Sequence, residues 1–201
     1  MSSTSYRPHR HRGRRTLTAA ALVLAAAFTA TAASTDSASA ATGKNVLNIS
    51  MQEQENTNWC WSASGNTIAS WFGYKYTQTQ FCNAAFGRAQ GGSCPNDQAT
   101  LEDDQTAFRW MGLSPGTVTS GVISYNAVQQ QIDAKRPMMA RIQWSSGGGH
   151  AEVLYGYDTS KSWVYWGDPW PDDYRYNWAT YDYYRSNSDF SWTHTLYGIG
   201  A

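Results

Sequence analysis

Apolar residues recur at helical spacing in the first half of the sequence. One stripe contains Ile68, Trp71 and Phe72, with Asn58 as the expected N-cap and Gly73 as a natural stop. A capping-box pattern and further apolar stripes follow it along the chain. The pattern predicts four helices: from Cys60 to Phe72, from a capping box of Thr77 and Gln80 to Phe86, from Asp97 to Met111, and from Ser124 to just before Pro137.

After Pro137 the helical spacing gives way to runs of aromatic and branched residues separated by turns, which is typical of β-strands. The pattern predicts four strands: Met138–Trp144, His150–Tyr157, Trp163–Gly167 and Ser191–Ile199. Residues 41–49 show neither pattern, and we expect a loosely held entry segment there. The predicted fold class is therefore α+β, with a helical N-terminal half packed on a C-terminal antiparallel β-sheet and a cleft between the two halves.

The first forty residues have the pattern of an export signal. Five arginines precede an almost uninterrupted run of small and apolar residues from Thr18 to Ala33, and Ala38-Ser39-Ala40 offers a cleavage site. We expect residues 1–40 to be a secretion signal peptide and the protein to be secreted and extracellular. The Arg14-Arg15 pair leaves the general and twin-arginine routes equally open. A membrane anchor is the weaker alternative, because the apolar run is short and poor in large residues.

The charge of the remaining chain narrows the possible partners. Without the leader, ten lysines and arginines stand against fourteen aspartates and glutamates, so the mature chain is mildly acidic. Nucleic-acid binding would need clustered basic residues, and the sequence has no such stripe. Residues 41–201 have the length of one domain. We expect this domain to be a monomer with neither a nucleic-acid nor a membrane partner.

Three cysteines in an exported protein leave one thiol unpaired. Cys82 and Cys94 bracket a stretch rich in glycine, which reads as a loop that a disulfide closes. We therefore expect a disulfide between Cys82 and Cys94, which leaves Cys60 as the free thiol. The same two cysteines do not have zinc-ligand spacing. No phosphate-binding glycine loop is present either, so the sequence implies no metal and no cofactor.

Cys60 lies in the first turn of the predicted helix, where unpaired backbone N–H groups and the helix dipole favour negative charge. A thiolate there would be a nucleophile for acyl transfer. Gln54, six residues upstream, offers a side-chain N–H for the oxyanion that forms, and the backbone N–H of Cys60 offers a second. Gln52 competes with Gln54 for this assignment. A buried structural cysteine and a surface glutamine are the plain alternatives.

His150 is the expected proton carrier. It follows Gly147-Gly148-Gly149 and opens a predicted strand, so that its ring can lie at the rim of the sheet, where backbone and substrate pass close by. His194 is the one competitor outside the leader, and it sits mid-strand between two threonines. We expect His194 to be a core or surface residue.

Asp168 is the expected partner of His150. The strands His150–Tyr157 and Trp163–Gly167 flank a polar turn, which predicts a hairpin centred near residue 159 or 160. In that hairpin Asp168 lies opposite His150, with the side chains about 5 Å apart. A carboxylate at this place can orient the imidazole, although Asp168-Pro169 is also a turn dipeptide that would explain a loop-shaping aspartate.

The ordered set formed by Gln54, Cys60-Trp61, Gly149-His150-Ala151 and Asp168-Pro169-Trp170 resembles the papain-like cysteine proteases. It looks most like their compact bacterial secreted branch, which includes avirulence-effector proteases of plant pathogens and relatives of the staphylococcal thiol proteases. The resemblance covers about residues 50–200, and thus makes residues 41–201 the protease domain. It implies that Gln54 is the oxyanion donor, Cys60 the nucleophile, His150 the general base and acid, and Asp168 the group that orients His150. Papain itself has asparagine at the last position, and its Gly- and Cys-rich run before the nucleophile is missing here.

The predicted function is that of a secreted cysteine endopeptidase, which hydrolyses protein or peptide substrates through a thioacyl intermediate. We expect Trp166 or Trp170 to shield the bond between His150 and Asp168 from water. Two other functions stay open. A transglutaminase or deamidase would use the same thiol chemistry on side-chain amides. A binding module without catalysis would use the ten tryptophans and thirteen tyrosines on glycans.

Overall fold

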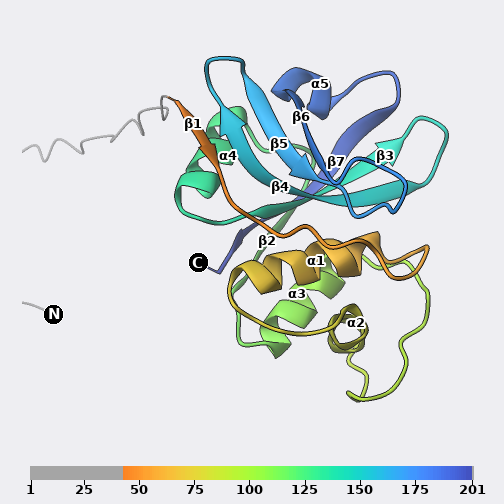
Figure 1. Cartoon of the computed structure of the whole chain (residues 1–201). Helices are drawn as coiled ribbons and strands as arrows, with labels where there is room; N and C mark the ends of the chain where they lie inside the picture. The colour runs from red at the N-terminus through yellow and green to blue at the C-terminus, as the bar shows by residue number, and fades with distance from the viewer. Residues whose placement is uncertain (1–42, 201) are drawn as a thin grey trace, which may run out of the picture. The chain divides into compact units, whose positions relative to one another are not determined.

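The computed structural model describes residues 43–200, which form five helices and seven strands. The predicted α+β class is confirmed, while the expected signal peptide over residues 1–40 lies outside the described residues. Figure 1 shows three helices, α1, α2 and α3, grouped beside the β-sheet. The helices are α1 (Cys60–Trp71), α2 (Gln78–Ala85), α3 (Leu101–Trp110), α4 (Tyr125–Asp133) and α5 (Tyr181–Arg185).

The seven strands form one antiparallel sheet in the order β2-β7-β3-β4-β5-β6, and β1 pairs with β4 outside this path. The strands are β1 (Lys44–Val46), β2 (Pro115–Ser120), β3 (Met138–Trp144), β4 (Gly149–Asp158), β5 (Trp163–Gly167), β6 (Tyr176–Thr180) and β7 (Phe190–Ile199). The four strands expected after Pro137 are all present. The segment expected to be loosely held contains β1, whose register pairs Lys44 with Asp158.

Capping decides where the helices begin. The predicted capping box of Thr77 and Gln80 is present at α2, with both of its hydrogen bonds formed. The predicted start of α3 at Asp97 is wrong. The helix begins at Leu101, because Thr100 and Asp103 form a capping box of their own.

Asn58 is not the N-cap of α1, and this prediction is wrong as well. Trp59 occupies the cap position without a side-chain hydrogen bond. The side chain of Asn58 instead donates to the carbonyl oxygen of Asn96 at 2.8 Å, and its backbone N–H donates to Asn96 Oδ1 at 2.9 Å. These bonds tie the residues before α1 to the loop before α3, and they leave the start of the helix uncapped.

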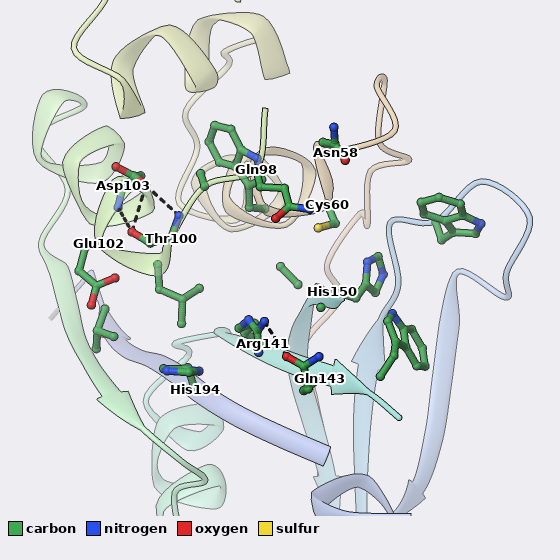
Figure 2. A pocket seen from close by; sticks show the side chains of 18 of the residues that line it. Asn58, Cys60, Gln98, Thr100, Glu102, Asp103, Arg141, Gln143, His150 and His194 are labelled. Carbon is green, nitrogen blue, oxygen red and sulfur yellow. Dashed lines mark hydrogen bonds between the residues drawn. The ribbon is translucent and has the colours of Figure 1, made fainter. Parts of the chain in front are cut away.

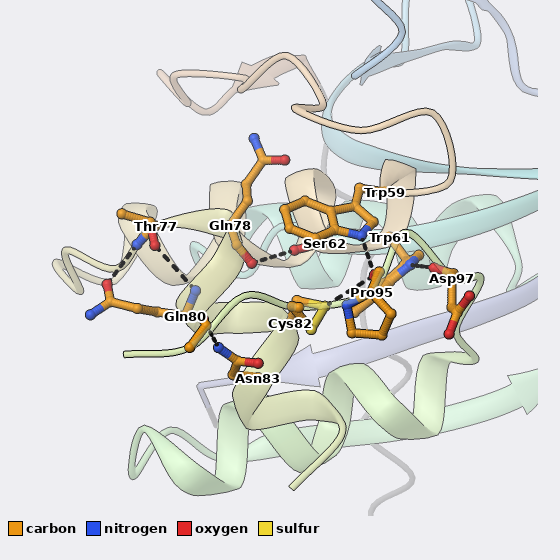
Figure 3. Close-up of a disulfide and its surroundings, with 12 residues drawn as sticks. Trp59, Trp61, Ser62, Thr77, Gln78, Gln80, Cys82, Asn83, Pro95 and Asp97 are labelled. Atoms are coloured by element: carbon orange, nitrogen blue, oxygen red, sulfur yellow. Dashed lines mark hydrogen bonds between the residues drawn. A yellow bond between two sulfur atoms is a disulfide. The ribbon is translucent and has the colours of Figure 1, made fainter. Parts of the chain in front are cut away.

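A disulfide between Cys82 and Cys94 closes the loop that follows α2, as expected. Figure 3 shows this loop beside two tryptophans at the start of α1. The indole N–H of Trp59 donates to the carbonyl of Pro95 at 2.9 Å, and that of Trp61 donates to Asp97 at 3.1 Å. The disulfide and the two indoles together hold the loop against the residues that flank Cys60.

Helix α1 is fixed to the sheet as well as to the loop. The buried hydroxyl of Ser64 donates to the carbonyl oxygen of Ala151 in β4 at 3.0 Å. Ser64 lies one turn after Cys60, and Ala151 follows His150 directly. This bond therefore sets the position of Cys60 relative to His150.

Asp104 is an acidic residue buried without a partner between α3 and α1. It is 0% exposed, and neither carboxylate oxygen has a hydrogen-bond partner among the described residues. Burial raises its pKa well above the ordinary value, and the negative charges of Cys60, Asp103 and Glu102 raise it further. The folded protein therefore holds a proton on Asp104 that the unfolded chain releases above about pH 4.

Replacing Asp104 by asparagine is expected to stabilise the protein at about pH 8 and to change little at about pH 4. The reason is that folding must keep the wild-type carboxyl protonated, which costs more free energy as the pH rises above the unfolded pKa. Thermal unfolding at both pH values measures the effect, and we expect Tm to rise by a few degrees at the higher pH. Glu55→Gln removes a carboxylate from an exposed site that does not act on Asp104 and is the matched control. An equal shift in Tm at both pH values would contradict this account of Asp104.

Candidate active site

A cleft of about 910 Å³ lies between the helices and the sheet. Figure 2 shows it from close by, with Cys60 from α1 and His150 from β4 among the side chains that line it. The residues around it come from α1 and α3 and the loops before them, from strands β2, β3, β4 and β7, and from the loop after β5. The prediction of a cleft between the two halves is therefore met, and two of the expected site residues line it.

Cys60 is the first residue of α1 and is partly buried. It is the free cysteine of the described chain, since the other two form the disulfide. Within residues 43–200 its backbone N–H has no hydrogen-bond acceptor. An uncapped helix start with free N–H groups stabilises an anion, so an oxyanion can form beside Cys60.

His150 lies at the start of β4 with its ring buried. Its Nε2 atom lies 2.8 Å from Oδ1 of Asp168. Because Nε2 is taken by Asp168, Nδ1 is the ring nitrogen left for the Cys60 thiol, which lies close enough to raise the pKa of His150. The imidazole thus lies between a thiol and a carboxylate, which is the order that thiol-based acyl transfer needs.

Two tryptophans enclose the imidazole. The ring of Trp144 is stacked on it, with centroids 6.1 Å apart, and Trp170 meets it edge-on at 6.2 Å. Trp170 therefore occupies the shielding position expected for one of two tryptophans, whereas Trp166 packs against Tyr184 instead. Trp144 is a neighbour that the sequence did not reveal, because it reaches His150 only through the pairing of β3 with β4.

Asp168 reaches His150 by a different register from the predicted one. The hairpin pairs Val153 with Gly167 and Leu154 with Trp166, and a bulge follows. Extending this pairing places Asp168 opposite Glu152, so that His150 is its diagonal neighbour on the same face of the sheet. The predicted pair meets, but the predicted register is wrong by two residues, because the turn between Asp158 and Trp163 is centred later than predicted and the bulge offsets only part of that shift.

Asp168 is held in place by its own loop. Its Oδ1 also accepts the backbone N–H of Trp170 at 2.8 Å, and its backbone N–H donates to the carbonyl of Arg175 at 3.1 Å. Arg175 donates to the carbonyl of Asp168 and forms an ion pair with Glu53 at 3.0 Å. The carboxylate is 6% exposed in this setting, so it keeps one orientation toward the imidazole.

The pKa of His150 is raised to about 10. Burial of the ring lowers it, but the hydrogen bonds to Asp168 and Cys60 and the negative charges of Cys60 and Glu152 outweigh burial. His150 is therefore an imidazolium at neutral pH in this setting. A protonated ring can donate a proton to a leaving amine, and it stabilises a thiolate beside it.

Glu152 is a buried carboxyl next to His150 and Asp168, and our prediction from the sequence missed it. It accepts a hydrogen bond from the hydroxyl of Tyr184 at 2.7 Å and is 2% exposed. Burial raises its pKa to about 8; the positive charge of His150 and the Tyr184 hydrogen bond oppose this rise, whereas the charge of Asp168 adds to it. The signal for it was present in the sequence, because residues two apart on a strand share a face, and Glu152 follows His150 by two.

Among residues 43–200, His150, Glu152 and Asp168 form the one group that could share a metal ion. The ligand atoms of His150, Glu152 and Asp168 lie within 4.8 Å of one another. All three side chains are buried, and the hydrogen bond between His150 and Asp168 already uses two of those atoms. The same atoms cannot hold a metal and keep this hydrogen bond.

Gln54 lies beside the site with its amide engaged elsewhere. Its Nε2 donates to the carbonyls of Asn56 at 2.9 Å and Thr57 at 3.0 Å, and it lines a smaller neighbouring pocket. Its competitor Gln52 is bonded to Ser70 and Asn66. A role for Gln54 as oxyanion donor therefore requires that its amide leave one of these carbonyls when a substrate binds.

His194, expected as a core or surface residue, also lines the cleft. It sits in β7 opposite Arg141, and its Nδ1 lies 3.1 Å from the hydroxyl of Thr193. It lies on a different strand from His150 and has no carboxylate partner among the described residues.

None of the helices in residues 43–200 has the length and apolar character of a membrane span.

Comparisons with known proteins identify a family and similar folds. A family model described as "Papain-like cysteine protease AvrRpt2" matches residues 43–188. Among solved structures, the peptidase domain of Streptococcus ComA, a bifunctional ABC transporter involved in quorum sensing, aligns with a TM-score of 0.51 at 16% identity. That alignment covers 73% of this chain and 95% of the ComA domain. Xylellain, a cysteine protease from Xylella fastidiosa, aligns with a TM-score of 0.45 at 9% identity over 77% of this chain and 85% of its own. No curated protein matches the sequence.

Proposed function

The chain belongs to the papain-like cysteine proteases of the AvrRpt2 family, and on that premise we propose that it hydrolyses peptide bonds through a triad of Cys60, His150 and Asp168. The observation that carries the proposal is the position of His150. Its ring lies between the thiol of Cys60 and the carboxylate of Asp168, and it lines the cleft of about 910 Å³.

The reaction begins with a thiolate on Cys60 and an imidazolium on His150. The sulfur attacks the scissile carbonyl carbon, and the electron pair of the carbonyl moves to its oxygen. When the tetrahedral intermediate collapses, the carbon–nitrogen bond breaks and His150 gives its proton to the leaving amine. The product of this half-reaction is a thioester on Cys60.

Water completes the cycle. The now neutral His150 takes a proton from a water molecule, whose oxygen attacks the thioester carbon. Collapse of the second intermediate releases the carboxylic acid and returns the thiolate, while His150 is again protonated. Asp168 stabilises the imidazolium and keeps Nε2 turned away from the sulfur, so that Nδ1 is the atom that exchanges protons.

The backbone N–H of Cys60 supports the oxyanion in both intermediates, since it is free at the start of α1. Gln54 is the proposed second donor. Its amide is buried next to the helix start, and it would have to turn from the carbonyls of Asn56 and Thr57 toward the cleft.

We also propose that the protein is secreted after removal of residues 1–40. The charge and apolar pattern of these residues supports export. The disulfide between Cys82 and Cys94 is compatible with an oxidising compartment.

The chemical nature of the products tests the proposed reaction. We incubate the protein with a denatured protein substrate and measure new peptide termini and free ammonia, with Cys60→Ala as the matched control. Peptide-bond hydrolysis yields new termini without ammonia, and the control yields neither. Ammonia release without new termini would overturn the proposal in favour of a deamidase or transglutaminase.

A further inference from the structure

Arg141 lies on the floor of the cleft, next to the residues that hold His150. It is part of β3, where it pairs with Ala151 of β4 and His194 of β7. Its guanidinium covers the α-carbon of Gly149, because a Cβ built there would lie 2.8 Å from Cζ of Arg141. Gly149 immediately precedes His150. The positive charge of Arg141 thus lies against Gly149, the residue bonded to the proposed proton carrier His150, and Figure 2 shows Arg141 and His150 in the same cleft.

The guanidinium is oriented by two neutral groups. Nη1 donates to the hydroxyl of Thr193 at 2.8 Å, and Nη2 donates to the side-chain oxygen of Gln143 at 2.9 Å. A guanidinium has five N–H donors. The remaining donors have no acceptor within residues 43–200, although the side chain is only partly exposed.

No carboxylate neutralises this charge. The three salt bridges of the described residues join His150 to Asp168, Arg175 to Glu53 and Arg185 to Asp182, and none includes Arg141. An arginine that is held in one orientation at the wall of a cleft and has no counterion is a ready partner for an anionic group of a ligand.

Acidic residues do line the cleft, but they belong to other elements. Asp103 accepts from the backbone and hydroxyl of Thr100 as part of the cap of α3. Glu102 is exposed on the same helix, and Asp173 lies in the loop after β5. Arg141 is therefore a positive charge on the floor of a cleft whose carboxylates lie on other elements, and none of them is paired with it.

We propose that Arg141 binds a side-chain carboxylate of the substrate, so that the protease selects peptides with glutamate or aspartate close to the scissile bond. This inference rests on the proposed function, since it assigns the substrate class of the same cleft. A carboxylate fits the open donors of an oriented guanidinium with paired hydrogen bonds, and a lysine side chain at that place is repelled. Because Arg141 covers Gly149, the acidic residue lies within one or two residues of the bond that Cys60 attacks.

Matched peptides test the assignment. We measure kcat/KM for peptides that carry glutamate, glutamine or lysine at each of the two positions on either side of the scissile bond. At one of these positions the wild-type protein is expected to favour glutamate over glutamine by at least about tenfold. The Arg141→Met variant, which keeps the apolar stem, is expected to lose this ratio, and Arg141→Glu is expected to favour lysine instead. Arg88→Met removes the same charge from an exposed site outside the cleft and should leave the ratio unchanged.

The readout is a ratio within each variant, so differences in folding or total activity cancel. A wild-type ratio near one at every position, or an Arg141→Met variant that keeps the preference, would overturn the inference. Cleavage of any of the peptides to new termini would still support the proposed function. If the wild-type protein cleaves none of them and no protein substrate, the proposed function fails, and the specificity inference fails with it.

Discussion

Replacing Cys60 by alanine is expected to lower kcat/KM for peptide hydrolysis by about 10,000-fold or more, because the variant has no atom that can form the thioester. The remaining groups, a buried imidazolium and a helix start, can bind a substrate but cannot form the acyl-enzyme. The measurement is the rate of cleavage of a peptide that the wild-type protein hydrolyses.

The fold should survive this change. Cys60 is partly buried at the first position of α1, and the helix is anchored by Ser64 to Ala151 and by the loop around the disulfide. Circular dichroism and thermal unfolding of Cys60→Ala should therefore match the wild-type protein. Cys60→Ser, which keeps the size of the side chain, is a second variant that should lose turnover. Hydrolysis at the wild-type rate in either variant would end the assignment of Cys60.

The second large effect is expected at Asp168. Asp168→Ala removes both the acceptor for Nε2 of His150 and a charge that raises its pKa, and we expect kcat/KM at neutral pH to fall by about a hundredfold. Asp168→Asn keeps an oxygen acceptor and should lose about tenfold. The exposed Asp172→Asn, in the same loop, is the matched control.

The pH profile distinguishes a role of Asp168 in orienting and charging His150 from a role in shaping its own loop. The pKa of His150 is about 10 in the wild-type site, and Asp168 is among the causes that raise it. Without the carboxylate that pKa falls, so the imidazolium is lost at lower pH, and the alkaline limb of kcat/KM moves toward neutral pH. Activity that falls equally at all pH values would instead indicate that Asp168 only shapes its loop.

The sequence predicts elements that carry a pattern of their own better than elements that depend on pairing with distant segments. Strands β3 and β5 have the predicted bounds, and α2 has the predicted capping box, because each carries its signal within its own residues. Three strands, β1, β2 and β6, and the short helix α5 went unpredicted. Each has six residues or fewer, and strands of this kind form by pairing with segments distant in sequence.

The functional residues divide along the same line. Cys60, His150 and Asp168 can be selected from the sequence alone, because their residue types and neighbours mark them. Arg141 joins His150 only through the pairing of β3 with β4. The register of Asp168 is miscounted because the turn between Asp158 and Trp163 is centred one residue later than the sequence suggests, and the bulge between Leu154 and Gly156 shifts the pairing back by only one residue.

The most direct test of the central claim is mass spectrometry after treatment with an epoxide that reacts with thiolates, combined with an assay of hydrolysis on the same sample. The account predicts one adduct per molecule, on Cys60, with Cys82 and Cys94 still joined, and a loss of activity that matches the labelled fraction. Labelling that leaves hydrolysis intact, or a protein fully active with Cys60 unreactive, would contradict it.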